Sequence, residues 1–178
     1  MAVIQVYDKK FDSYLSQEQI ASRIDVIATQ LNADYAGKKP LFIAILNGSF
    51  IFASDLFRKL TIPAEISFIK LASYKGSKST GQVITAIGLD NDLFGRDVII
   101  LEDIVDTGKT LFEFLPQLRH QQPLSLRIVA LLHKPVSTVY PIKIDYLGFT
   151  IPDKFVVGYG LDYDGLGRNI PEIYQLIE

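Results

Sequence analysis

Three carboxylates and a short phosphate-binding pattern lie together in one segment of the chain. This segment follows the apolar run 97–101 and reads Glu102-Asp103-Ile104-Val105-Asp106-Thr107-Gly108-Lys109-Thr110. The amides and hydroxyls of Thr-Gly-Lys-Thr at the start of a helix can hold a phosphate, and a glycine there permits close backbone approach. The carboxylates would repel that phosphate. We therefore expect them to bind the vicinal hydroxyls of a sugar or a hard divalent cation.

Two other interpretations of this segment are possible. A nucleotide-binding P-loop requires a glycine five residues before the glycine of Gly-Lys-Thr, and position 103 is aspartate, so that pattern fails. A purely structural interpretation is a capped helix start with surface acids, in which Asp106 is the N-cap. The segment by itself leaves this second interpretation open.

The apolar pattern predicts the elements that position this segment. A helix is predicted after Ser16, because apolar residues from Ile20 to Tyr35 recur at helical spacing and Ser16 forms a capping box with Gln19. Short apolar runs then alternate with helical stretches, which indicates a parallel α/β sheet. The predicted strands are 41–46, 64–72, 97–101, 126–132 and 144–149, with further helices at 50–60 and 108–119.

Ligands of open parallel sheets bind beyond the carboxyl ends of the strands, so the loops after Leu46, Leu101 and Leu132 are the candidate site. The segment 73–82 is rich in glycine, serine and lysine, and it is either a hairpin tip or a mobile lid. The tail after Gly148 lacks helical periodicity. We expect it to form a small irregular appendage over one edge of the sheet.

Composition limits the class of protein. The 178 residues are 48% apolar and 21% charged, which is typical of a globular chain long enough to bury a core. A net charge of −2 argues against a general nucleic-acid binder. Without cysteine and with only His120 and His133, the chain has no disulfide, thiolate metal site, histidine-rich metal site or cysteine nucleophile. We find no secretory signal or membrane-length apolar run, and we expect a cytoplasmic protein.

Two blocks carry a resemblance to a known family. The stretch 98–110, V-I-I-L-E-D-I-V-D-T-G-K-T, resembles the phosphoribosyl diphosphate signature of the type I phosphoribosyltransferases, and its acidic part is most similar to the hypoxanthine-guanine branch. The stretch 151–161, I-P-D-K-F-V-V-G-Y-G-L, resembles the purine-binding hood of that branch, as do Asp162, Tyr163 and Arg168 after it. The resemblance spans about residues 41–168.

The resemblance implies a single phosphoribosyltransferase domain over residues 1–178. Its fold would be α/β, with a parallel twisted sheet flanked by helices and a small hood. The core would span about residues 16–149. The hood would consist of about residues 150–178 together with N-terminal residues.

The resemblance also implies roles for residues around the phosphate segment. Asp106 would be the general base near purine N7. Glu102 and Asp103 would bind the ribose hydroxyls, directly or through Mg²⁺. The cradle of the 5-phosphate would be formed by Thr107, Gly108, Lys109 and Thr110.

Further matching residues would bind the purine and pyrophosphate. Lys134 would bond the 6-oxo group, Phe155 would stack on the base, and the backbone of Val156 would contact it. Asp162 would be a ligand of a second Mg²⁺. The residues assigned to pyrophosphate and to the closing loop are Asn47, Gly48, Ser73, Tyr74 and Arg168. Simpler interpretations are that Phe155 and Val156 belong to the core, that Lys134 is a solvated surface lysine, and that 162–165 is only a turn.

One departure from the family concerns the loop after the first buried strand. The family often has Leu-Lys-Gly there, whereas this chain has Leu46-Asn47-Gly48. The missing lysine puts that side chain's pyrophosphate contact and any subunit-bridging role in doubt. The resemblance implies a cis peptide between Leu46 and Asn47, which aims backbone amides at pyrophosphate.

The function implied is purine salvage: a Mg²⁺-dependent transfer of the phosphoribosyl group from phosphoribosyl diphosphate to a 6-oxopurine. Hypoxanthine or guanine would give IMP or GMP, in a homodimer or homotetramer that binds neither nucleic acid nor membrane. One alternative is a pyrimidine-type phosphoribosyltransferase, which the aromatic hood and Lys134 disfavour. Another is a non-catalytic regulator that senses phosphoribosyl diphosphate and binds nucleic acid, which the lack of basic excess disfavours.

Overall fold

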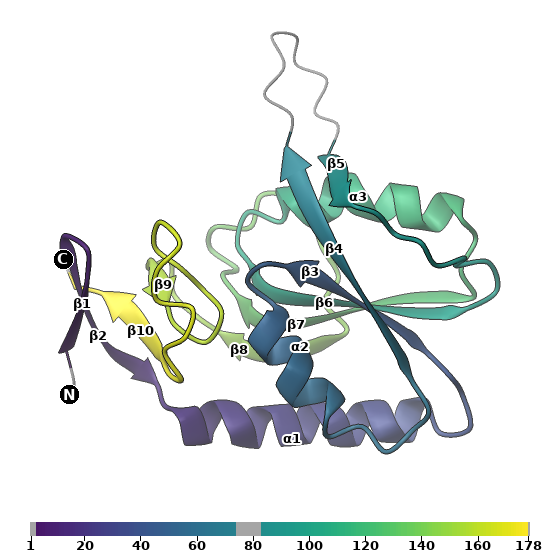
Figure 1. Cartoon of the computed structure of the whole chain (residues 1–178), viewed down its shortest axis with the longest axis horizontal. Coiled ribbons are helices and arrows are strands. Elements are labelled where there is room, and N and C mark those ends of the chain that lie inside the picture. Colours follow the sequence, from purple (N-terminus) through teal and green to yellow (C-terminus); the bar gives the residue numbers. More distant parts are fainter. Residues whose placement is uncertain (1–2, 74–82, 178) are drawn as a thin grey trace, which may run out of the picture.

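The computed structural model describes residues 3–73 and 83–177, and its centre is a six-stranded sheet (Figure 1). The order across the sheet is β5-β4-β3-β6-β7-β8, and five strands run parallel while β5 is antiparallel to β4. The predicted α/β class with a parallel sheet is confirmed. The strands are β3 (Leu41–Leu46), β4 (Glu65–Ser73), β5 (Val83–Ile87), β6 (Asp97–Val105), β7 (Ser125–His133) and β8 (Tyr146–Thr150).

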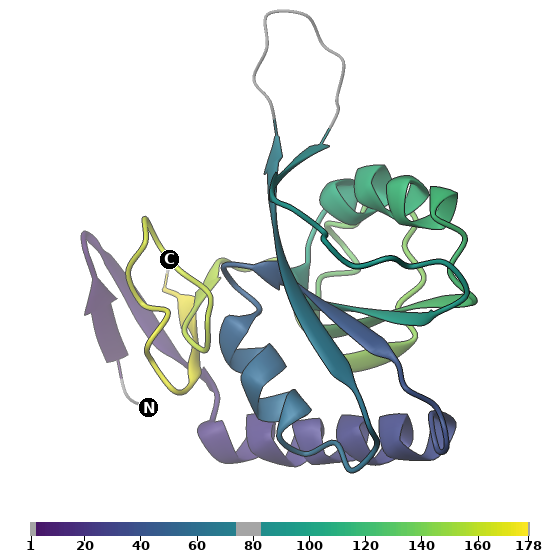
Figure 2. The same ribbon diagram turned by 45° about the vertical axis from the view of Figure 1, so that its right-hand side comes forward.

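Helices cover both faces of this sheet (Figures 1 and 2). Phe42 and Ala44 of β3 belong to the core cluster formed with α1 (Gln17–Asp34) and α2 (Phe50–Phe57). Their neighbours Leu41, Ile43 and Ile45 belong to the cluster formed with α3 (Lys109–His120). Because successive side chains of a strand point to opposite faces, a sheet covered on both sides requires strands that are apolar throughout.

The first helix begins where the sequence predicts. The backbone N–H of Gln19 donates to the Ser16 hydroxyl at 3.3 Å, and the Gln19 side chain accepts from the N–H of Ser16 at 2.9 Å. The predicted capping box is therefore confirmed.

The two ends of the chain form a second, smaller sheet in the order β1-β2-β10-β9. The prediction of an irregular tail is wrong for part of this region, because the last strand pairs antiparallel with both β2 and β9. Ile151, Tyr159 and Leu161 belong to the same core cluster as α1, so this hood is packed against the main sheet. Its strands are β1 (Val3–Val6), β2 (Lys9–Leu15), β9 (Val156–Val157) and β10 (Ile173–Leu176).

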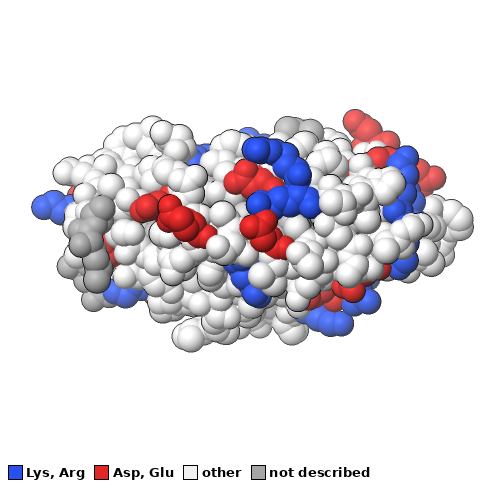
Figure 3. All heavy atoms as spheres, turned by 90° about the horizontal axis from the view of Figure 1, so that it is seen from below, with Lys and Arg blue, Asp and Glu red and all other residues white. Residues whose placement is uncertain are grey.

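The surface carries charges of both signs. On the face seen from below, acidic and basic side chains are interspersed without a continuous band of one sign (Figure 3). Among the helices that the structure describes, none combines the length and apolar character needed to cross a membrane.

Candidate active site

The candidate residues meet at one edge of the sheet. Asn47 and Gly48 directly follow β3, and Lys134 directly follows β7. The neighbouring strand β6 continues to Val105 instead of ending at Leu101, because its pairing with β7 extends that far. The three strands are parallel neighbours, so their carboxyl ends lie side by side, as the sequence predicts.

The loop after β3 passes directly over the acidic pair. A Cβ atom at position 48 would lie 1.6 Å from Oδ2 of Asp103, so only glycine fits at this position. A Cβ atom at Gly160 of the hood would in turn lie 2.1 Å from the carbonyl oxygen of Gly48. The peptide between Leu46 and Asn47 is cis, as the family resemblance implies. The backbones of Gly48 and Gly160 are thus in contact with each other, and the Asp103 side chain lies against Gly48.

Glu102 and Asp103 are neighbouring carboxylates, of which Asp103 is buried and Glu102 is half-buried. Burial and the neighbouring Asp103 carboxylate raise the pKa of Glu102 well above its usual range. Burial also raises the pKa of Asp103, although the positive charge of Arg168 acts in the opposite direction. Oε2 of Glu102 is buried and has no hydrogen-bond partner. Buried, unsatisfied carboxylate oxygens are suited to a cation or to sugar hydroxyls.

The predicted phosphate cradle, residues 107–110, lies at the start of α3. Gly108 is the N-cap and has a φ of 79°, so the alternative in which Asp106 is the N-cap is wrong. A Cβ atom at Gly108 would lie 2.6 Å from the carbonyl oxygen of Tyr140, which explains why glycine is required there. A small cavity of about 100 Å³ is bordered by Glu102 and the segment 104–111. A helix start can bind an anion through its backbone amides, and here the N–H of Lys109 donates to the Thr107 hydroxyl at 3.3 Å.

Lys134 and Asp106 form an ion pair across the ends of β7 and β6. The Lys134 Nζ lies 3.1 Å from Oδ2 of Asp106 and 3.7 Å from Oδ1 of Asp153. Lys134 is only 5% exposed, so the interpretation of a solvated surface lysine is wrong. The Asp106 side chain is 46% exposed and remains accessible to a ligand.

Sequence reasoning missed the residues that support this ion pair. The hydroxyl of Thr138 lies 2.7 Å from the carbonyl oxygen of Asp106 and 2.9 Å from that of Lys134, so it can donate to either. Nε2 of His133 lies 3.1 Å from the same hydroxyl. Asp153 lies in the stretch 151–161 that resembles the purine-binding hood, but no function was predicted for it from the sequence. A Ser-Thr pair three residues after Lys134 was the only available signal for Thr138.

The hood contains an exposed aromatic side chain, Phe155. Phe155 is 43% exposed. Its ring makes an edge-to-face contact with the Tyr163 ring, and the two ring centroids are 5.8 Å apart. Val156 and Val157 are buried, so the interpretation as core residues holds for the valines but not for Phe155. The same segment supplies Asp153, whose Oδ1 lies 3.7 Å from Nζ of Lys134.

Asp162 and Arg168 are paired with each other. An Nη atom of Arg168 lies 2.6 Å from Oδ1 of Asp162, and the other Nη donates to the carbonyl oxygen of Gly160. Asp162 also accepts from the N–H of Gly165, so the turn interpretation of 162–165 holds as well. Within residues 3–73 and 83–177, no group of three side chains is arranged to hold a metal by itself.

Of the segment assigned to the lid, the structure describes only Ser73. Ser73 is the last residue of β4, which neighbours β3 in the sheet. Tyr74 and the rest of the predicted lid, up to Gln82, lie outside the described residues.

Comparison with known proteins agrees with this geometry. The family described as "Phosphoribosyl transferase domain" matches residues 10–164. The hypoxanthine-guanine phosphoribosyltransferase of Lactococcus lactis is 40% identical over 168 residues, which is 93% of this chain and 91% of that protein. The crystal structure of such an enzyme from Bacillus anthracis, with a HEPES molecule in the active site, has a TM-score of 0.88 and 36% identity, covering 93% of this chain and 98% of that one. A hypoxanthine phosphoribosyltransferase from Staphylococcus aureus matches with a TM-score of 0.88 and 40% identity, over 93% of this chain and 91% of that one.

A phosphate cradle and a carboxylate pair at the end of a parallel sheet, together with this match, define a phosphoribosyltransferase, and the chain belongs to that family. Within the family its place is the hypoxanthine-guanine branch, the purine-salvage transferases that the relatives and neighbouring structures represent.

Proposed function

We propose that this enzyme transfers the 5-phosphoribosyl group of phosphoribosyl diphosphate to hypoxanthine or guanine, which yields IMP or GMP and pyrophosphate. The observation that carries this proposal is the 3.1 Å contact between Lys134 and Asp106. A 6-oxopurine presents O6 and N7 side by side on one edge. A lysine donor next to a carboxylate is complementary to that edge when N7 carries a proton.

Asp106 has the chemistry of a general base toward the purine. The purine must lose a proton as its nitrogen attacks carbon 1 of the ribose. A carboxylate within hydrogen-bond reach of N7–H can accept that proton. The ammonium of Lys134 would then donate to O6 and stabilise the negative charge that develops there. Phe155 offers an exposed ring on which the base can stack, and the backbone of Val156 beside it would complete the purine site.

The acidic pair is proposed to hold the ribose and a divalent cation. Unsatisfied Oε2 of Glu102 and the shared burial with Asp103 favour a hard cation such as Mg²⁺. With no third carboxylate clustered there among the described residues, substrate oxygens and water would complete the coordination. A bound Mg²⁺ would neutralise charge on the leaving pyrophosphate. We propose Asp162 as the ligand of a second Mg²⁺, which requires its ion pair with Arg168 to rearrange.

The remaining substrate contacts follow from position. Thr107, Gly108, Lys109 and Thr110 would bind the 5-phosphate through the amides at the start of α3. The backbone of Asn47 and Gly48, together with Arg168, would contact pyrophosphate. The position of Arg168 supports this placement, because it donates to the carbonyl oxygen of Gly160, and Gly160 lies against the backbone of Gly48 beside Asp103. We propose that Ser73 and Tyr74 begin the loop that closes over the site.

The test is an assay of monophosphate formation from each base with phosphoribosyl diphosphate and Mg²⁺. We expect IMP or GMP with hypoxanthine or guanine and no comparable reaction with adenine or orotate. Preferential use of orotate would favour the pyrimidine-type alternative. Binding of phosphoribosyl diphosphate without any product would favour the regulator.

Three accompanying proposals concern organisation. The chain would fold as one domain with a core of about residues 16–149 and a hood from both ends, and a single cooperative thermal transition would support this. It would form a homodimer or homotetramer, which sedimentation equilibrium can distinguish from a monomer. It would act in the cytoplasm, which cell fractionation can examine.

A further inference from the structure

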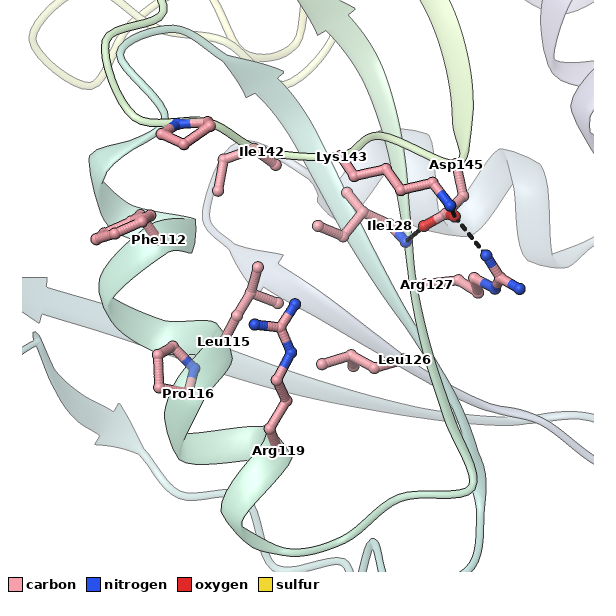
Figure 4. A pocket seen from close by; sticks show the side chains of 11 residues that line it. Phe112, Leu115, Pro116, Arg119, Leu126, Arg127, Ile128, Ile142, Lys143 and Asp145 are labelled. Carbon is pink, nitrogen blue, oxygen red and sulfur yellow. Dashed lines mark hydrogen bonds and ion pairs between the residues drawn. The ribbon is translucent and has the colours of Figure 1, made fainter.

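A second cavity lies away from the candidate active site. It has a volume of about 370 Å³ and lies between α3, the first residues of β7 and the segment 141–145 (Figure 4). Cavities that bind small molecules usually have volumes of about 300–1,000 Å³. Its apolar walls include Phe112, Leu115, Leu126, Ile128 and Ile142.

The polar groups of this cavity carry an excess of positive charge. Oδ1 of Asp145 lies 2.8 Å from Nη1 of Arg127 and 3.5 Å from Nζ of Lys143. Arg119, in the last turn of α3, forms no ion pair with another side chain of the described residues, and Figure 4 shows its guanidinium beside the apolar wall. The cavity is thus lined by three cationic side chains, Arg119, Arg127 and Lys143, and by one acidic side chain, Asp145. The cation without an acidic partner lies next to Leu115 and Leu126.

We propose that this cavity binds an organic anion with an aromatic or branched apolar body. The apolar walls would take up the body of the ligand, and Arg119 would form a charge-assisted hydrogen bond with its anionic group. A fully polar anion such as inorganic phosphate would leave the apolar walls unfilled. A neutral apolar molecule would leave Arg119 without a partner.

The cavity also adjoins the residues that hold the phosphate cradle. The Ile142 side chain, which lines the cavity, lies 3.2 Å from where a Cβ atom of Gly108 would be. The Phe112 ring contacts Tyr140, whose N–H donates to the carbonyl oxygen of Thr107. A ligand in the cavity would therefore contact the supports of the cradle without occupying it.

A fluorescent aromatic sulfonate, 8-anilinonaphthalene-1-sulfonate, is a suitable probe for the whole chain. We expect one probe to bind per chain, and Arg119→Gln to weaken its binding about tenfold or more, as expected for loss of a charge-assisted hydrogen bond. Arg58→Gln is the matched control, because Arg58 is exposed at the end of α2 and does not line this cavity. The affinity of the Arg58→Gln variant for the probe should equal that of the unmodified protein.

Saturating IMP separates this site from the substrate site. The inference is supported if the probe still binds at full stoichiometry in the presence of IMP. It is overturned if IMP displaces the probe competitively, if Arg119→Gln binds the probe as well as Arg58→Gln does, or if no probe binds. This test does not depend on turnover, so a failure of the proposed reaction would be recognised separately in the product assay.

Discussion

The ammonium group of Lys134 lies 3.1 Å from the carboxylate of Asp106, although 28 positions separate them in the sequence. Parallel pairing of β6 with β7, in which Val105 lies opposite His133, brings the two residues to adjacent strand ends. The hydroxyl of Thr138 adjoins the carbonyl oxygens of both residues. We propose that this arrangement aligns a proton acceptor and a proton donor for the same edge of a purine.

Asp106→Asn should lower turnover by about 10²- to 10⁴-fold, which is the usual contribution of general acid–base catalysis. Binding of phosphoribosyl diphosphate should change less, because other residues hold its ribose and phosphate. Steady-state kinetics and a direct binding titration measure the two effects. Asp153→Asn is the matched control, since Asp153 also lies near Lys134, at 3.7 Å, and its loss of turnover should be smaller. Equal losses of binding and turnover in Asp106→Asn would exclude the base role.

Lys134→Met keeps most of the apolar stem but removes the charge. We expect kcat/KM for hypoxanthine and guanine to fall about tenfold to a hundredfold, because a hydrogen bond from a charged donor is lost. Lys38→Met at an exposed position provides the control and should leave the kinetics unchanged. If the unmodified enzyme uses adenine better than hypoxanthine, the assignment of Lys134 to a 6-oxo group is wrong.

Glu102→Gln should stabilise the free protein while impairing catalysis. Burial and Asp103 raise the pKa of Glu102, so the folded state binds more protons than the unfolded state above the unfolded pKa. The stability of the unmodified protein therefore falls as pH rises through that window. The Tm advantage of Glu102→Gln should be largest at about pH 8 and shrink toward about pH 4.5.

Thermal unfolding at several pH values, without Mg²⁺, measures this difference. Asp90→Asn removes one carboxylate from an exposed position and should show no such pH dependence. A variant that is less stable than the unmodified protein at every pH would show that the Glu102 charge is compensated in the folded state.

Gly48→Ala should displace the loop after β3 or the Asp103 carboxylate. The added Cβ would lie 1.6 Å from Oδ2 of Asp103, and forcing an extra methyl into a packed site usually costs about 1–3 kcal/mol. We expect a lower Tm and a large loss of activity. Gly88→Ala is the control, because its Cβ would meet only the Asp90 carboxylate, at 3.3 Å. Retained activity in Gly48→Ala would show that the close contact is not needed for catalysis.

Asn47→Lys restores the residue that the family often has at this position. Asn47 is exposed, and an added exposed charge contributes about 1 kcal/mol or less. We therefore expect only a modest change in KM for phosphoribosyl diphosphate or in the oligomer equilibrium. A large gain in turnover would instead show that the lysine side chain matters and that asparagine weakens this enzyme.

The local features of the fold were predictable from the sequence. The apolar run at Leu41–Leu46 and the capping box at Ser16 depend on residues close together in the chain, and the structure confirms both. The ends of the strands were predicted less accurately: the strand predicted to end at Leu101 extends to Val105. Strand ends depend on how far the neighbouring strand continues to pair, and the sequence of one strand does not contain that information.

The hood and the supports of the site depended on contacts distant in sequence. The short strands β1, β2 and β10 are stabilised by one another from opposite ends of the chain, so neither end by itself shows a recognisable pattern. Likewise, only the Ser-Thr pair after Lys134 hints at Thr138 as a partner of Asp106, and nothing in the local sequence marks Arg119 as a residue that lines a cavity.

The sequence by itself determined the chemical types at the site: paired acids before a predicted phosphate cradle, a lysine after the next strand, and a hood motif containing an aromatic residue. Residue types and short spacings are properties of the chain, and the backbone conformation of a helix start follows from them. Only the tertiary structure decided which groups touch, including the ion pair of Lys134 with Asp106 and the backbone of Gly48 over Asp103. The reason is physical, because burial, pKa shifts and cavities arise when strands distant in sequence exclude water together.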